Sequence, residues 1–218
     1  MNHFILEIPF VFAKTNHTNQ FYMSLSGLDD EALVTRLQSG EREAFTILIQ
    51  RWQHKVYAFC LRQLQDPTLA EEAAQDVFLK VFKGIHNFQH QSLFSTWLFR
   101  ILTNHCHNLR SYHYLRKRQA HEPLEGTQED NPRTLPDEQT AHTGAHIEQC
   151  QLKSSLNEAL NHLPEDQREV LILRDVQDHS YDEIAQILNI SVGTVKSRVH
   201  RARNNLRPIL QNLLRGHP

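Results

Sequence analysis

The feature that most constrains the fold is an acidic stretch, interrupted by prolines, that lies between two helical ones. Residues 119–150 hold seven acids against the single base Arg133. Pro123, Pro132 and Pro136 exclude a long helix, because each proline lacks a backbone donor and clashes with the preceding turn. Large apolar residues are sparse here, so the stretch has little surface to bury. It therefore predicts a linker that divides the 218 residues into two small domains.

Outside this linker the apolar residues recur with the period of an α-helix. Between residues 43 and 66 they stand at positions 44, 45, 48, 49, 52, 56, 59 and 60. Gly40 closes the helix before, Asp66-Pro67 begins the next, and Leu163-Pro164 separates two more. The chain contains only seven glycines and few alternating stretches. We predict an all-α fold: two small helical domains joined by a flexible acidic linker.

The C-terminal domain is predicted to contain a helix-turn-helix. Ser180 and Glu183 stand at capping-box spacing, and Ser191 is placed to cap the helix that follows a short turn. The second helix, "ISVGTVKSRVHRARNNLR", carries five bases and no acid, although the whole chain has a net charge of −2. Two short helices joined by a tight turn, the second one basic, are typical of DNA-binding domains.

The two faces of this second helix separate by residue type. At about 100° per residue, Val195, Val199, Ala202 and Leu206 share one face, which we expect to pack on the first helix. The remaining surface carries hydrogen-bond donors suited to base edges and phosphates. The alternative is that these polar side chains only face solvent and contact no DNA. The residues expected to contact DNA are Lys196, Ser197, Arg198, His200, Arg201, Arg203 and Asn204, with Arg198 and Arg203 on the flanks, toward the phosphates.

Residues 94–118 combine bases with aromatic side chains and contain no acid. Such a surface suits single-stranded nucleic acid, because lysine and arginine side chains follow the phosphate backbone while aromatic rings stack on unpaired nucleobases. Phe94, Trp97 and Phe99 also recur at helical spacing, so some of them belong to the core.

Metal and enzyme sites are not predicted. His105, Cys106 and His107 are consecutive and point in three directions from a helix, whereas helical metal ligands are three or four residues apart. The sequence has no glycine-rich phosphate loop, no HExxH and no nucleophile elbow. We therefore expect neither catalysis nor a cofactor.

Three further observations concern location and the start of the chain. No apolar run approaches the roughly 20 residues that span a membrane, and three scattered cysteines favour a reducing, cytoplasmic setting. Glu7 and Pro9 argue against a signal peptide. We expect residues 1–24 to be an unstructured extension or a mis-called start, with Met23 as the candidate start.

These motifs together resemble bacterial sigma factors of the extracytoplasmic-function (ECF) type. "LPEDQREVLILRDVQDHSYDEIAQILNISVGTVKSRVHRAR" is similar to their region four. "AFTILIQRWQHKVYAFCLRQL", "AEEAAQDVFLKVF" and "FSTWLFRILTNHCHNLRSY" are similar to region two, in the same order. The resemblance covers about residues 25–215, with the short linker where larger sigma factors carry a third domain.

The resemblance implies a protein that binds core RNA polymerase and directs promoter-specific initiation. It implies an extension at 1–24, region two at 25–118, the acidic linker at 119–150 and region four at 151–215. Region four would read the −35 element as duplex, and region two would read and melt the −10 element. The linker would enter the polymerase channel, and an anti-sigma factor is an expected further partner.

The resemblance also assigns residues of region two. The expected −10 contacts are Trp97, Arg100, Asn104, Asn108, Arg110, Tyr112, Arg116 and Lys117, with Asn104 facing a flipped base. The helix at 69–83, whose apolar residues Ala73, Ala74, Val77, Phe78, Val81 and Phe82 are expected in the core, would lie against the clamp coiled coil of the largest polymerase subunit. Its expected contacts are Glu72, Gln75, Asp76, Leu79 and Lys80.

The alternative is a helix-turn-helix regulator that binds an operator without being a polymerase subunit. The basic, aromatic stretch at 94–118 argues against it, since a protein that reads only duplex DNA needs no surface for unpaired bases.

Overall fold

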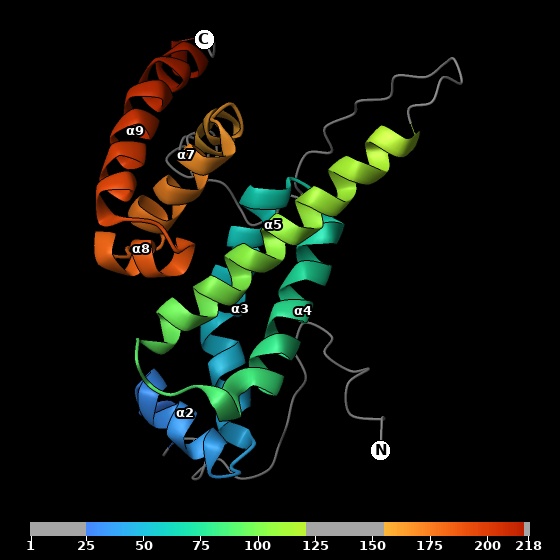
Figure 1. Ribbon diagram of the computed structural model, residues 1–218, viewed down its shortest axis with the longest axis vertical. Helices are drawn as coiled ribbons and strands as arrows, with labels where there is room; N and C mark the ends of the chain where they lie inside the picture. The colour runs from blue at the N-terminus through green and yellow to red at the C-terminus, as the bar shows by residue number, and fades with distance from the viewer. Residues whose placement is uncertain (1–24, 121–154, 216–218) are drawn as a thin grey trace, which may run out of the picture.

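A computed structural model describes residues 25–120 and 155–215 of the chain (Figure 1). The proposed extension at 1–24 and nearly all of the predicted linker lie outside the described residues. Every regular element in these two ranges is helical, which confirms the predicted all-α class. No helix in the same ranges is long and apolar enough to cross a membrane.

The first described range folds into four α-helices and one short 3-10 turn. They are α2 (Asp30–Gln38), α3 (Glu43–Leu64), α4 (Pro67–Gly84), η1 (Ile85–Asn87) and α5 (Phe94–Ala120). The long helix α5 runs diagonally across α3 and α4, with α2 at the lower end of the bundle (Figure 1).

Asp66 and Gly40 mark helix boundaries as predicted, and Asp29 adds a cap that was not predicted. The Asp29 carboxylate accepts a hydrogen bond from the Ala32 N–H at the start of α2, and Asp66 accepts one from the Leu69 N–H at the start of α4. Gly40, just after α2, has a φ of +103°, a value that glycine adopts without strain. Helix α5 extends to Ala120, two residues past the predicted end of region two.

An aromatic cluster between α3 and α5 forms the centre of the first bundle. Trp52 and Phe59 of α3 meet Phe99 of α5 edge-on, with ring centroids 6.1 and 5.6 Å apart. Phe94 and Phe99 are buried, as the helical spacing predicts. Trp97 is only partly buried and packs beside Phe88 at 5.1 Å.

Two predicted core positions of α4 are corrected by the structure. Phe82 is 41% exposed, and its ring lies 4.9 Å from that of Phe45 at the rim of the bundle. Ala74 is half-buried. The buried stripe of α4 is narrower than predicted, and consists of Ala70, Ala73, Val77, Phe78 and Val81.

The second described range begins in a helix at 155–161. It continues through α7 (Glu165–Leu171), the π-helical turn η2 (Ile172–Val176), α8 (Tyr181–Leu188) and α9 (Val192–Arg215). These helices lie along one side of α5 (Figure 1). Two domains joined by a flexible linker do not by themselves predict this contact with α5.

Candidate DNA-binding and polymerase-binding surfaces

Helices α8 and α9 form the predicted helix-turn-helix, with each predicted cap in place. The Ser180 hydroxyl accepts a bond of 3.2 Å from the Glu183 N–H, and the Glu183 carboxylate accepts one of 2.7 Å from the Ser180 N–H. Asn189 turns the chain with a φ of +53°. The Ser191 hydroxyl then accepts a bond of 3.1 Å from the Thr194 N–H and starts α9.

Helix α9 separates its buried and exposed sides as predicted. Val195, Val199 and Ala202 are at most 1% exposed and pack against α8 and α7. Leu206 is partly buried at the end of this face. The side chains left exposed on the opposite side are Lys196, His200, Arg201 and Asn204, whereas Ser197 is half-buried.

The two arginines expected at phosphates have carboxylate partners within the same domain. Arg203 donates two hydrogen bonds to Asp175 of η2, at 3.1 and 2.6 Å. Arg198 Nε lies 3.3 Å from an oxygen of Asp166 in α7. The bond to Asp175 raises the pKa of Arg203 above its ordinary value, so this guanidinium stays charged.

The basic, aromatic part of α5 presents a stripe of exposed polar side chains. Residues four apart are neighbours on a helix surface, and a series of them winds around the helix by about 40° per step. The exposed members of this series are Arg100, Asn104, Asn108, Tyr112 and Arg116. Tyr112 is 58% exposed, which suits a ring that stacks on an unpaired base. The side chain of Lys117 lies outside the described residues.

Arg110 and Trp97 depart from this exposed stripe. Arg110 pairs with Glu165 of α7, in the second half of the chain, and donates a bond of 2.7 Å to Gln63 of α3. Trp97 fills the space beside Gly84, whose hypothetical Cβ would lie 3.3 Å from the indole ring. Held by Glu165 and Gln63, the side chain of Arg110 is only 16% exposed.

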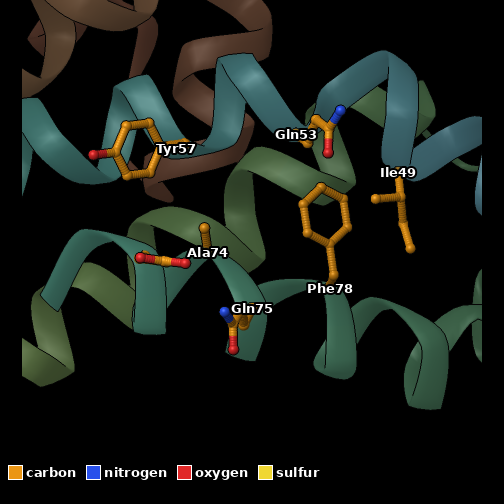
Figure 2. Close-up of a pocket in the computed structure, with 7 residues that line it drawn as sticks. Ile49, Gln53, Tyr57, Ala74, Gln75 and Phe78 are labelled. Atoms are coloured by element: carbon orange, nitrogen blue, oxygen red, sulfur yellow. The ribbon is translucent and has the colours of Figure 1, made fainter. Parts of the chain in front are cut away.

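The outer surface of α4 carries the residues predicted to contact polymerase. Glu72, Gln75, Asp76 and Lys80 are exposed, and Leu79 is half-buried among them. Beside this surface a shallow, mostly apolar pocket opens between α3 and α4 (Figure 2). Its lining comprises Ile49, Gln53, Tyr57, Glu71, Ala74, Gln75 and Phe78.

A histidine links this α4 surface to α5. Lys80 Nζ lies 2.5 Å from His105 Nδ1, and an Asp76 oxygen lies 3.4 Å from His105 Nε2. Burial, reinforced by the charge of Lys80, lowers the pKa of His105 below its ordinary value. The neutral ring is therefore favoured, and its Nδ1 accepts a hydrogen bond from the Lys80 ammonium. The sequence considered His105 only as a metal ligand, which its spacing argues against, and nothing in that spacing indicated this contact.

The three consecutive residues of that motif diverge, as helical spacing requires. Cys106 points into the core with its sulfur 4.0 Å from that of Cys60. His107 turns toward Glu169 of α7. In the part of the chain that is described, no group of three or more metal-ligating side chains is close enough to hold an ion.

Comparison with known proteins places the chain in a family. The family model for sigma-70 region 2 matches residues 48–121, and the model for sigma-70 region 4 matches residues 153–206. The structure of the sigma factor RpoE with the anti-sigma factor NepR from Bartonella quintana is 28% identical, with a TM-score of 0.56, over 80% of this chain and 98% of that one. CnrH, solved with the cytosolic domain of CnrY, shares the fold at a TM-score of 0.58 and 24% identity, over 84% of this chain and 97% of that one.

Two curated relatives extend over most of the chain. The RNA polymerase sigma-H factor of Pseudomonas aeruginosa is 32% identical over 191 residues, which are 85% of this chain and 96% of the relative. The ECF RNA polymerase sigma-E factor of Haemophilus influenzae is 32% identical over 197 residues, which are 86% and 98% of the two chains. With both sigma-70 regions matched in order, the chain belongs to the extracytoplasmic-function family of RNA polymerase sigma factors.

Proposed function

We propose that this sigma factor divides its work among three surfaces: α9 for the −35 element, α5 for the −10 element and α4 for core polymerase. The chain is a sigma factor that directs promoter-specific transcription, and it is not an enzyme. The observation that carries the assignment is the capped helix-turn-helix, whose second helix buries Val195, Val199 and Ala202 and exposes Arg201 and Asn204.

Helix α9 reads the −35 element from the major groove. Lys196, His200, Arg201 and Asn204 supply exposed donors on one side, and Arg pairs with guanine more often than with any other base. Ser197 lies at the edge of this surface. Arg198 and Arg203 reach phosphates only by exchanging or sharing their partners Asp166 and Asp175.

Helix α5 contacts the −10 element as an unpaired strand. Arg100 and Arg116 follow the phosphates, Tyr112 offers a stacking surface, and Asn104 and Asn108 offer amides to base edges. Trp97, Arg110 and Lys117 complete the set of proposed −10 contacts. Trp97 presents only the exposed part of its ring, and Arg110 becomes available when it leaves Glu165.

Helix α4 binds the clamp coiled coil of the largest polymerase subunit. Glu72, Gln75, Asp76 and Lys80 form a polar rim around Leu79, which suits an interface with a small apolar centre. The pocket beside Gln75 and Phe78 enlarges the surface available to a partner helix (Figure 2).

The remaining assignments follow the family. We assign 25–118 to region two, 119–150 to an acidic linker that enters the polymerase channel, 151–215 to region four, and 1–24 to an extension. The solved relative with NepR supports an anti-sigma factor as a further partner of this chain. A protein that works with polymerase acts in the bacterial cytoplasm.

The test is transcription in vitro with core polymerase and fragmented genomic DNA. Adding the chain should produce new transcripts whose start sites share −35 and −10 elements. Asn104→Ala should reduce open-complex formation, while binding to a −35 duplex stays unchanged. An absence of new transcripts with a chain that binds specific duplex DNA would instead identify a regulator that acts without polymerase.

A further inference from the structure

A buried histidine of α5 lies against the surface of α4 that we assign to core polymerase. His105 is only 7% exposed. Its Nδ1 lies 2.5 Å from Lys80 Nζ, and its Nε2 lies 3.4 Å from an oxygen of Asp76. The Asp76 side chain is 57% exposed and Lys80 is exposed as well. The ring therefore contacts two charged side chains that remain accessible to a partner.

The two contacts fix where the proton of the neutral ring lies. An ammonium group only donates hydrogen bonds, so the Nδ1 that faces Lys80 must be the acceptor. The proton then lies on Nε2, which faces Asp76, and a carboxylate only accepts. The distance of 3.4 Å exceeds that of an ordinary N–H···O bond, and Nε2 has no closer hydrogen-bond partner among the residues that the structure describes. The neutral ring thus holds Lys80 firmly and Asp76 loosely.

Asp76 and Lys80 have the spacing of a direct ion pair. They are four residues apart on α4, and an acid followed by a base at this spacing pairs across one helical turn. Within the described part of the chain, each of them contacts His105 instead. A direct pair would neutralise the two charges that a partner needs. The contact with His105 also fixes the flexible lysine side chain in advance, which reduces the entropy that an interface loses on binding.

We propose that His105 is a positioning residue of the polymerase-binding surface, whose neutral ring keeps Asp76 and Lys80 apart and holds Lys80 in place for core polymerase. The inference rests on the function proposed above. It adds to that function a residue that acts through α4 without being one of the proposed polymerase contacts. It also makes polymerase binding depend on the protonation of a single ring.

The direction of this pH dependence follows from the donors and acceptors. A protonated ring has no acceptor, so it repels the Lys80 ammonium and attracts the Asp76 carboxylate. Both charged groups that act on His105 belong to α4, and the described parts of α2, α3, α7 and α8, which also contact α5, supply none. Burial and Lys80 lower the pKa of His105. Affinity for polymerase should be constant above about pH 6.5 and should fall as the pH decreases through the lowered pKa.

Two substitutions of His105 in the full-length chain test its positioning role. His105→Leu removes both ring contacts and lets Asp76 pair with Lys80, so affinity for core polymerase at pH 7.5, without DNA, should fall about fivefold. His105→Gln supplies an amide oxygen that accepts from Lys80 and an amide N–H that donates to Asp76, so affinity should return close to that of the wild type. Circular dichroism and binding to a −35 duplex report whether both variants are folded.

A pH series separates positioning from simple packing. Between pH 7.5 and pH 5 the wild type should lose about threefold more affinity for core polymerase than His105→Gln, which cannot become charged. The matched control is His86→Gln, which changes an exposed histidine just after α4 and should keep the wild-type profile. If His105→Leu does not fold, the profile of His105→Gln still decides. A pH dependence that His105→Gln retains in full would overturn the proposal.

Lys80→Met and Asp76→Asn distinguish this inference from the function on which it rests. If neither variant weakens polymerase binding, the contact is not on α4 and both proposals fail. If they weaken it and a folded His105→Leu does not, only the positioning role is wrong. Nuclear magnetic resonance of the free chain gives a further answer without polymerase. The neutral His105 ring should carry its proton on Nε2, and a ring protonated on Nδ1 instead would overturn the positioning role even in an active sigma factor.

Discussion

Arg203 of α9 and Asp175 of η2 form a two-point ion pair, with Nε 3.1 Å from one carboxylate oxygen and Nη2 2.6 Å from the other. The arginine side chain is 51% exposed and the aspartate side chain 38%, so water screens the pair. Its contribution to stability is at most about 1 kcal/mol. Its larger effect is on DNA binding, because the carboxylate occupies the donors that a phosphate would use.

Asp175→Asn should therefore strengthen DNA binding. The change frees Arg203 and removes an acid from the DNA-facing side of the domain, so affinity should rise equally for matched and mismatched duplexes. The salt slope should become steeper by up to about one ion. Binding titrations at several salt concentrations measure both. Asp178→Asn removes a neighbouring exposed charge and serves as the control; an equal gain there would mean that only the net charge matters.

Arg201→Ala should act on sequence rather than on general affinity. Arg201 is exposed opposite the buried Val199 and Ala202, so its removal leaves the core intact. If it pairs with a base, binding to the cognate −35 element should weaken by about 1–3 kcal/mol, and less when that base pair is changed. Arg207→Ala, another exposed arginine of α9, is the matched control. Equal losses on all sequences would show that Arg201 contacts phosphate.

The local elements could be predicted from the sequence because their signals are local. Ser180, Glu183 and Ser191 act within one helical turn, and the face of Val195 and Val199 follows from helical spacing alone. Asn104 was assigned through the resemblance to region two, and its side chain is exposed. These features depend only on residues up to four positions away.

Features set by packing between distant helices were missed. Phe82 follows the buried Val81 by one residue, so it lies at the edge of the stripe, where its ring meets that of Phe45. Arg110 fits the basic series of α5, yet Glu165, more than fifty positions away, takes its guanidinium. Ion pairs of this kind depend on which helix faces meet in three dimensions. The periodicity of apolar residues within one helix does not predict which other helix will pack against it.

Glu72→Lys should weaken binding to core polymerase. Glu72 is exposed on α4 and its carboxylate contacts neither His105 nor Lys80, so the reversal changes the surface without disturbing the bundle. We expect about a tenfold loss of affinity for core polymerase, with unchanged binding to a −35 duplex. Glu158→Lys is the control, since it reverses an exposed helical acid in the second half of the chain. A larger loss for Glu158→Lys than for Glu72→Lys would place the polymerase contact elsewhere.

Closure, meaning the packing of residues 155–215 against α5, should be most stable slightly below neutral pH, because two histidines in that contact have pKa values shifted in opposite directions. The hydrogen bond to Glu169 raises the pKa of His107, and the charges of Glu169 and Glu165 add to this, against burial and Arg110. The contribution of His107 to the stability of the closed form is complete below the ordinary histidine pKa of about 6.5. It is lost as the pH rises through the raised pKa of His107. Burial lowers the pKa of His179, against the attraction of Glu183 and Asp178 and with the repulsion of Lys55. Because the contact with Phe99 favours the neutral form of His179, its contribution to closure is complete above about pH 6.5. That contribution is lost as the pH falls through the lowered pKa of His179.

Scattering between pH 5 and pH 8.5 should therefore give the smallest radius of gyration near pH 6–6.5, with expansion on both sides. His107→Gln keeps a hydrogen-bond donor for Glu169 but cannot become charged, so the expansion on the alkaline side should disappear while the acidic side remains. His179→Phe keeps an aromatic ring against Phe99 and should remove the acidic side alone. His113→Gln changes a histidine of α5 that is not part of this contact and should leave both sides of the profile in place. A profile that stays flat in the wild type, or that loses neither side in the two variants, would mean that these histidines do not control closure.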